Sequence, residues 1–130
     1  MLRWIVSYWK TLLVLLAILV LSFMNPPSLP PSVTKLFSFD KLGHLMMYAG
    51  FTFVLLLDTS SLTGLRNPRR LLYLIGIAIP LSLGAITEIL QTVLFSPRAA
   101  EWGDFLSDTA GVFVGWLAFL VWRKWRQRCC

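Results

Sequence analysis

Charged residues are scarce in this chain: they make up 14% of its 130 residues, whereas hydrophobic residues make up 57%. Soluble domains usually have about a quarter charged residues and about half apolar ones. The mean hydropathy of +0.72 points the same way. A water-soluble fold of this size has too little interior to bury so much apolar surface. The composition therefore excludes most soluble classes and favours a protein that has lipid as its solvent.

Cysteine is nearly absent as well, since the only two are the final residues, Cys129 and Cys130. Neighbouring cysteines rarely pair with each other, and we expect this end to be cytoplasmic, so we predict reduced thiols and no disulfide framework. The net charge of +6 does not indicate nucleic-acid binding, because no basic face is interleaved with exposed aromatic residues. No long strand pattern or internal repeat is evident.

Apolar runs dominate the chain instead, and each is near the length of about 20 residues that spans a bilayer. Pro26 and Pro27 end the first run, and no small-residue cleavage site follows it, which favours a retained helix over a signal peptide. Pro80 lies inside the third run and is expected to kink it. We predict an all-α integral membrane bundle of four transmembrane helices in a single domain, residues 1–130, with helices at about 4–24, 39–57, 71–95 and 102–122, a proline-rich linker at 25–39 and a loop at 58–70.

Basic residues gather at alternate ends of these runs, and loops rich in lysine and arginine stay in the cytoplasm. Both termini are therefore predicted to be cytoplasmic, in a multi-pass protein of the inner (cytoplasmic) membrane. Of the acidic residues, only Asp58 falls on the cytoplasmic side. The basic residues on that side are Arg3, Lys10, Arg66, Arg69, Arg70, Arg123, Lys124, Arg126 and Arg128, against Lys35, Lys41 and Arg98 on the outer side.

Polar residues within the second and third helices follow helical spacing. Asp40, His44 and Tyr48 are spaced i, i+4, i+8 and therefore share one face. Glu88 and Gln91, spaced i, i+3, share a face of the third helix. Asp40 also suits a helix N-cap, and Tyr48 taken alone suits simple packing.

A stripe on the fourth helix combines acids with glycines. Asp104, Asp108, Gly111 and Gly115 lie on one face, and the GxxxG pair lets a neighbouring helix approach closely. That stripe carries the two aspartates into the bundle interior, although Asp104 also suits a helix N-cap. By helical rise, Asp108 lies about 9 Å below Trp102.

His44 and Glu88 lie about 5 and 10 Å below the outer ends of their helices, a depth similar to that of Asp108. The polar groups of the three helices are therefore expected to converge at one level below the outer surface. An ionisable group in the membrane costs at least a few kcal/mol, so it indicates a functional site. The alternative interpretation is that these groups form hydrogen bonds between helices and have only a structural role. The candidate catalytic residues are His44, Glu88, Asp104 and Asp108, and the candidate substrate-binding residues are Asp40, Lys41, Tyr48, Gln91, Arg98 and Glu101.

No metal site is predicted, and the sequence does not identify a cofactor. Carboxylates with one histidine suit a divalent cation, but their spacing matches no metal motif such as HExxH. Ser96 and Ser107 are nearby, yet nothing marks either as an activated nucleophile. General acid–base catalysis by His44 with Asp108 or Glu88 is the simpler enzymatic interpretation.

The pattern DKxxHxxxY at 40–48, ExxQ at 88–91, Arg98, and DxxxDxxGxxxG at 104–115 resembles the VanZ-like family over residues 38–120. The resemblance implies a small bacterial multi-pass membrane protein. The family's namesake is associated with low-level resistance to the glycopeptide teicoplanin. The last acidic position is commonly Asn in this family and is Asp108 here, which changes the charge of the site.

Three functions remain open. The first is an enzyme, or enzyme-like site, that acts on an envelope lipid or lipid-linked glycan from the outer leaflet, with Arg98 meeting a phosphate or carboxylate. The second is a non-catalytic module that binds a lipid or a partner protein and uses its polar cluster as structure. The third is a small transporter component. The expected partners are the bilayer, such a lipid, and a second copy of the chain.

Overall fold

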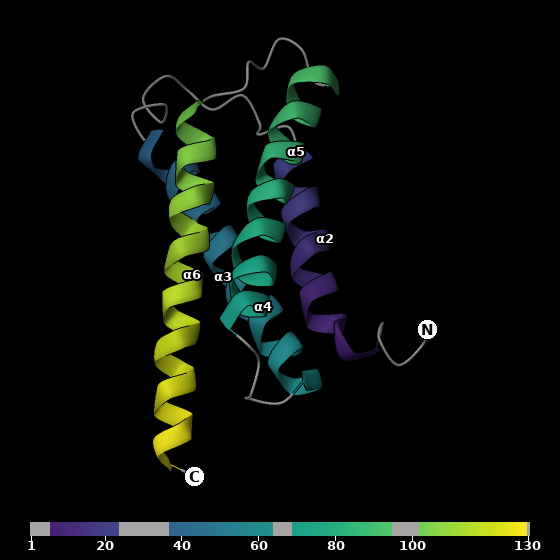
Figure 1. Ribbon diagram of the computed structural model, residues 1–130. Helices are drawn as coiled ribbons and strands as arrows, with labels where there is room; N and C mark the ends of the chain where they lie inside the picture. Colours follow the sequence, from purple (N-terminus) through teal and green to yellow (C-terminus); the bar gives the residue numbers. More distant parts are fainter. Residues whose placement is uncertain (1–5, 24–36, 64–68, 95–101, 130) are drawn as a thin grey trace.

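The computed structural model describes residues 6–23, 37–63, 69–94 and 102–129, nearly all of them helical (Figure 1). Helix α2 is Trp9–Phe23, α3 is Phe37–Thr63 and α6 is Trp102–Cys129. Between the last two, α4 (Arg69–Tyr73), η2 (Leu74–Ala78) and α5 (Ile79–Leu94) follow one another without a break. The described part contains no strand, so the prediction of an all-α fold is confirmed.

The helices form an antiparallel bundle. In Figure 1, α2 and the α4–η2–α5 rod run in one direction, while α3 and α6 run in the other. Helices α3 and α6 make the most extensive contact in the bundle. The end that contains Phe37, Leu94 and Trp102 is called the upper end below, and the end that contains Thr63 and Arg70 is called the lower end.

Three segments are long and apolar enough to cross a membrane: Lys41–Leu62, Arg70–Leu94 and Trp102–Arg128. Helix α2 is apolar but shorter, with 15 residues. The outward faces carry exposed large hydrophobic side chains such as Leu16, Ile89 and Val121. Such a surface is unfavourable in water and suits a lipid bilayer.

The glycine stripe of α6 allows its close approach to α3. A Cβ atom at Gly111 or Gly115 would overlap the backbone carbonyl of Leu45 or Ala49, respectively. Both glycines are buried, as is Val112 between them. Small residues let two backbones meet in the way that the GxxxG spacing predicts. This contact also fixes which face of α6 points inward.

Helix α3 is longer than predicted, and the predicted loop at 58–70 is wrong for residues 58–63. Asp58, Thr59 and Ser60 are buried in the last turns of the helix. Thr59 and Ser60 donate their hydroxyls to the carbonyls of Leu55 and Leu57. Polar side chains that bond within the helix or find partners on another helix do not have to end it.

Two further features concern the helices that follow, and the second is a helix end that differs from prediction. The five-residue π-helical segment Leu74–Ala78 ends two residues before Pro80, which was expected to kink this helix. Proline has no N–H to donate and its ring crowds the carbonyl four residues earlier, so a wider turn at that point relieves the conflict. Helix α6 continues beyond Trp122 to Cys129. Arg126 and Arg128 in its last turn suit the negative end of the helix dipole.

Candidate functional site

A histidine and an aspartate meet between α3 and α6 in the upper half of the bundle. His44 Nδ1 lies 3.0 Å from Asp108 Oδ1, and the two side chains are 10% and 2% exposed. With Asp108 ionised, Nδ1–H donates to the carboxylate, which leaves Nε2 of a neutral ring as an acceptor. The helical spacing of His44 and the glycine stripe below Asp108 turn both side chains toward this contact.

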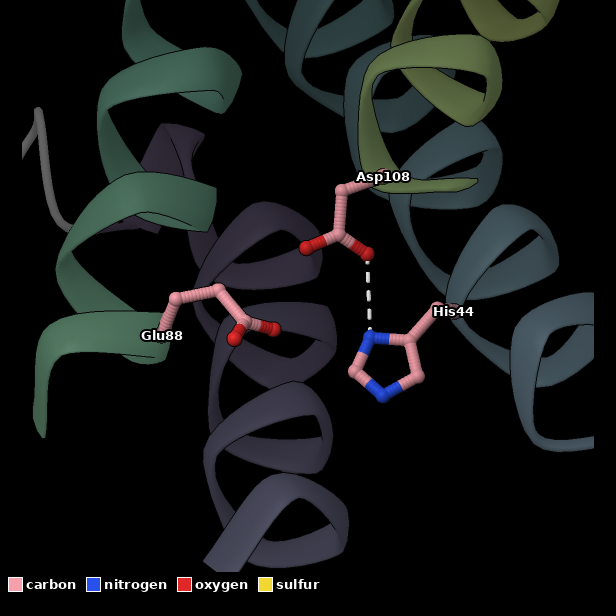
Figure 2. A group of neighbouring side chains, drawn as sticks. All are labelled: His44, Glu88 and Asp108. Atoms are coloured by element: carbon pink, nitrogen blue, oxygen red, sulfur yellow. Dashed lines mark hydrogen bonds and ion pairs between the residues drawn. The ribbon is translucent and has the colours of Figure 1, made fainter. Parts of the chain in front are cut away.

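Glu88 joins the pair from α5, so each of the three groups comes from a different helix. One ligand atom from each of His44, Glu88 and Asp108 can be chosen so that all three lie within 4.8 Å of one another. Figure 2 shows the Glu88 carboxylate pointing toward the His44 ring, opposite Asp108. Glu88 is 7% exposed. We call these three residues the acidic triad.

The second oxygen of Asp108 has no hydrogen-bond partner within the described part of the chain, although it is buried. Figure 2 shows that this oxygen, Oδ2, lies on the side of the carboxylate that faces Glu88. Gly84 makes room for it, since a Cβ at that position would lie 3.3 Å from Asp108 Oδ2. A buried, unsatisfied carboxylate oxygen is costly, and it marks the place where a proton, water or ion would bind.

A hydrogen-bonded pair lies next to the triad. Tyr48, which is fully buried, has its hydroxyl 3.0 Å from Thr87 Oγ1, and Thr87 donates in turn to the carbonyl of Gly84. Thr87 has one hydroxyl proton, so Tyr48 must be the donor in their bond. This chain ties α3 to α5 and holds Gly84 in position beside Asp108.

Above the triad lie two further candidates. Asp104 is half-buried in the first turn of α6, where a negative charge suits the helix dipole. The ammonium of Lys41 packs against Gly103, where a Cβ would lie 2.6 Å from Lys41 Nζ. Both residues therefore lie between the triad and the upper end of the bundle.

The structure brings together His44, Glu88 and Asp108, with Tyr48, Lys41 and Asp104 close by. Asp40 and Gln91 fall in α3 and α5, but their side chains lie outside the described set. Arg98 and Glu101 lie outside the described residues. The roles assigned to all these candidates stay predictions.

A third buried carboxylate, outside the triad, lies near the lower end. Asp58 is 2% exposed, and its Oδ2 accepts from the backbone N–H of Thr11 at 3.1 Å and from the Thr11 hydroxyl at 2.8 Å. Lys10 Nζ is 4.0 Å from Asp58 Oδ1. Thr11 is the third residue of α2, so Asp58 caps that helix from α3.

Helical periodicity holds the signal that would have placed Asp58 correctly. Position 58 follows His44 by 14 residues, which is close to a whole number of helical turns. Asp58 therefore lies near the face of Asp40 and His44 once the helix is extended past Leu57. Its partners Thr11 and Lys10 carry no comparable sequence signal, because they belong to another helix.

A pocket of about 430 Å³ opens near the lower end, well away from the acidic triad. Its lining residues include no histidine and no acid, so it lacks the histidine–carboxylate pairing of the triad. Trp116 Nε1 is buried there without a hydrogen-bond partner among the described residues. The lining residues are Leu72, Tyr73, Trp116, Leu120, Arg123, Lys124 and Gln127.

The chemistry available at the triad follows from its residue types. A histidine oriented by a carboxylate can accept and return a proton, and a nearby glutamate can do so as well. The same atoms are suitable ligands for a metal cation. Comparison of the chain with protein-family models, with curated proteins and with solved structures gave no match.

Proposed function

We propose that this chain is a VanZ-like membrane protein whose acidic triad binds, and acts as an acid–base site on, the polar part of an envelope lipid or lipid-linked glycan. The observation that carries the proposal is the buried bond between His44 and Asp108, with Glu88 beside it. Ionisable groups inside a membrane protein are expensive and usually mark a functional path or site. The quoted DKxxH and ExxQ patterns supply two of these residues.

The proposed orientation places the triad in the outer half of a four-span bundle. Basic residues of the described helices gather at the lower end, among them Lys10, Arg70 and Lys124, and such ends favour the cytoplasm. Helix α2 is taken as the fourth span: 15 residues extend about 22 Å. Its exposed leucines, Leu12, Leu13 and Leu16, suit lipid contact. In this orientation the triad lies at the level of the outer leaflet, where envelope precursors are used.

His44 is the proposed general base. Its Nδ1–H bond to Asp108 fixes the ring and stabilises the protonated form, so Nε2 can take a proton from a hydroxyl of the bound headgroup or from water. Glu88 supplies the second titratable group for returning a proton. Lys41, above the triad, provides a positive charge for an anionic headgroup.

A non-catalytic membrane module is the second candidate, and one observation favours it. Two of the helices that carry the triad, α3 and α5, are also joined by the hydrogen bond between Tyr48 and Thr87. Polar side chains in membrane proteins often stabilise helix packing in this way. In that case the triad contributes stability, and lipid or protein binding occurs elsewhere on the bundle.

The test is a cell-envelope phenotype, here the teicoplanin susceptibility and lipid profile of a bacterial host that expresses the protein. His44→Ala and Glu88→Gln are compared with wild type and with Gly50→Ala, whose added Cβ meets nothing within 4 Å. We expect both triad variants to lose the phenotype at normal expression. The melting temperature in detergent should stay near wild type for Glu88→Gln and fall only modestly for His44→Ala, which removes one buried hydrogen bond. An unchanged phenotype at normal expression rejects the proposal, and a collapse of the melting temperature supports the structural alternative.

A further inference from the structure

The acidic triad has the composition of a cation site as well as of an acid–base site. It offers one imidazole nitrogen and two carboxylates, and the chosen ligand atoms lie within 4.8 Å of one another. Ligands around a zinc or manganese ion sit about 2.0–2.2 Å from the metal, and therefore about 3 to 4.4 Å from each other. The separations in the triad are at most 4.8 Å, so shortening the longest by about 0.4 Å brings the triad into that range.

We propose that His44, Glu88 and Asp108 bind one divalent transition-metal cation of the Zn²⁺ or Mn²⁺ class between α3, α5 and α6. The inference rests on the proposed function and deepens it, because a bound cation would hold the phosphate or carboxylate oxygen of an envelope headgroup at the same site. It adds a cation to a set of residues for which the sequence pattern predicts no metal.

The unsatisfied oxygen of Asp108 is the first independent support. Asp108 is 1% exposed, and its Oδ2 has no hydrogen-bond partner in the described part of the chain. That oxygen faces Glu88 across the space beside Gly84 (Figure 2). A cation in this position would ligate an atom that is otherwise left without a partner in a buried setting.

Charge is the second support. Two carboxylates, those of Glu88 and Asp108, lie buried beside a single histidine, so acidic groups outnumber basic ones within the triad. Nearer the upper end, the ammonium of Lys41 from α3 packs against Gly103 of α6. Asp104 adds a further acid at the same end of α6. Buried negative charge inside a membrane protein is unfavourable, and a divalent cation between the two carboxylates would offset it directly.

The ligand types select the class of cation. Imidazole favours zinc and related first-row metals, whereas Mg²⁺ and Ca²⁺ prefer all-oxygen sites. Three protein ligands leave at least one position open, which is the arrangement of reactive rather than structural zinc sites. The open position suits a water molecule or an oxygen of an anionic headgroup.

The buried carboxylate that lies outside the triad in the described part of the chain makes a matched control. Asp58 is as deeply buried as Asp108, at 2% against 1% exposed. However, its Oδ2 already accepts two hydrogen bonds from Thr11. Asp58→Asn removes a buried negative charge of the same kind without touching the triad.

The experiment measures metal binding by the full chain in lipid nanodiscs, without a histidine tag. Cys129→Ser and Cys130→Ser are introduced into every protein, because adjacent thiols bind zinc on their own. The protein is stripped with a chelator and titrated with Zn²⁺ and, separately, Mn²⁺. Bound metal is counted by elemental analysis after gel filtration, which also reports whether each variant is folded.

We expect one equivalent of Zn²⁺ or Mn²⁺ in the parent and in Asp58→Asn. His44→Ala, Glu88→Gln and Asp108→Asn should each weaken binding by at least about tenfold, since even indirect supports of a metal site cost that much. Glu88→Gln preserves shape, so it keeps the test valid if a harsher variant does not fold. The inference is overturned if the parent shows no stoichiometric binding, or if all three triad variants bind the metal as tightly as the parent does.

Failure of this inference can be told apart from failure of the proposed function. If the purified protein binds no metal but the triad variants still lose the envelope phenotype in cells, the metal site is rejected and the acid–base proposal stands. Stoichiometric metal binding by a protein whose triad variants keep the phenotype establishes a structural metal site and rejects the proposed function.

Discussion

His44 and Asp108 are 64 positions apart in sequence, yet His44 Nδ1 and Asp108 Oδ1 lie 3.0 Å apart across the contact of α3 and α6. The bond lies about one helical turn above the close contact of Gly111 with the backbone carbonyl of Leu45. Such a bond in a nonpolar environment is coupled to the packing that surrounds it. The geometry of the triad therefore depends on a packing contact that itself involves no polar side chain.

A double-mutant cycle should detect this coupling. His44→Ala and Asp108→Ala each remove one partner, and the double variant removes both. We expect a coupling free energy of about 0.5–3 kcal/mol, because the two groups are in direct contact. Unfolding in mixed detergent micelles gives the four free energies, and strictly additive costs would show that the bond contributes nothing.

Tyr48 and Thr87 should respond unequally to loss of their shared bond. In Tyr48→Phe, Thr87 keeps its own donation to the carbonyl of Gly84, so the expected cost is about 1 kcal/mol. In Thr87→Val, the buried Tyr48 hydroxyl loses its acceptor, and the cost should rise to about 2 kcal/mol. Equal costs in thermal unfolding would contradict the assigned donor direction.

The glycine stripe gives a prediction with a built-in control. Gly115→Ala places a methyl group against the backbone carbonyl of Ala49, so α3 and α6 must separate, at a cost of about 1–3 kcal/mol. Gly50→Ala adds the same methyl group where nothing lies within 4 Å. That control should be neutral, or more stable by up to about 1 kcal/mol. Equal melting temperatures for the two variants would show that the helices do not pack through this stripe.

The cap of α2 by Asp58 can be tested with a graded pair. Asp58→Ala removes both bonds to Thr11 and should cost about 2 kcal/mol. Asp58→Asn keeps an oxygen that accepts from Thr11 and should cost less than half as much. Hydrogen exchange of the α2 amides reports the local effect, and protection unchanged in Asp58→Ala would rule out the cap. The ion pair of Asp58 with Lys10 should contribute little to the free energy of unfolding, because its atoms are 4.0 Å apart and the Lys10 side chain is 55% exposed.

The orientation of the bundle is checked by labelling single cysteines in whole cells, in a background that lacks Cys129 and Cys130. We expect Ala99→Cys to react with an impermeant reagent from outside and Asn67→Cys to react only after the cells are opened. The reverse pattern would place the acidic triad toward the cytoplasm and remove the main reason for an envelope substrate.

Helical spacing alone indicated much of the site. The i, i+4 relation of His44 to Tyr48 and the stripe through Asp108 and Gly111 are properties of single helices, and they hold wherever those helices form. The missed part lies at helix ends, where serine, threonine and aspartate suit loops as well as buried turns. Composition placed Asp58 in a loop, whereas in the structure it lies in a helix and its carboxylate accepts two hydrogen bonds from Thr11 on the neighbouring helix.

The sequence by itself determined that the chain is helical and apolar, which faces its polar residues share, and where its basic residues gather. Only the tertiary structure decided that Glu88 meets His44 and Asp108, that Asp108 Oδ2 is left without a partner in the described chain, and that Asp58 caps α2. The physical reason is that periodicity fixes a residue's direction around its own helix axis. The rotation and depth of one helix against another are set by packing, here the contact of Gly111 and Gly115 with the backbone of α3.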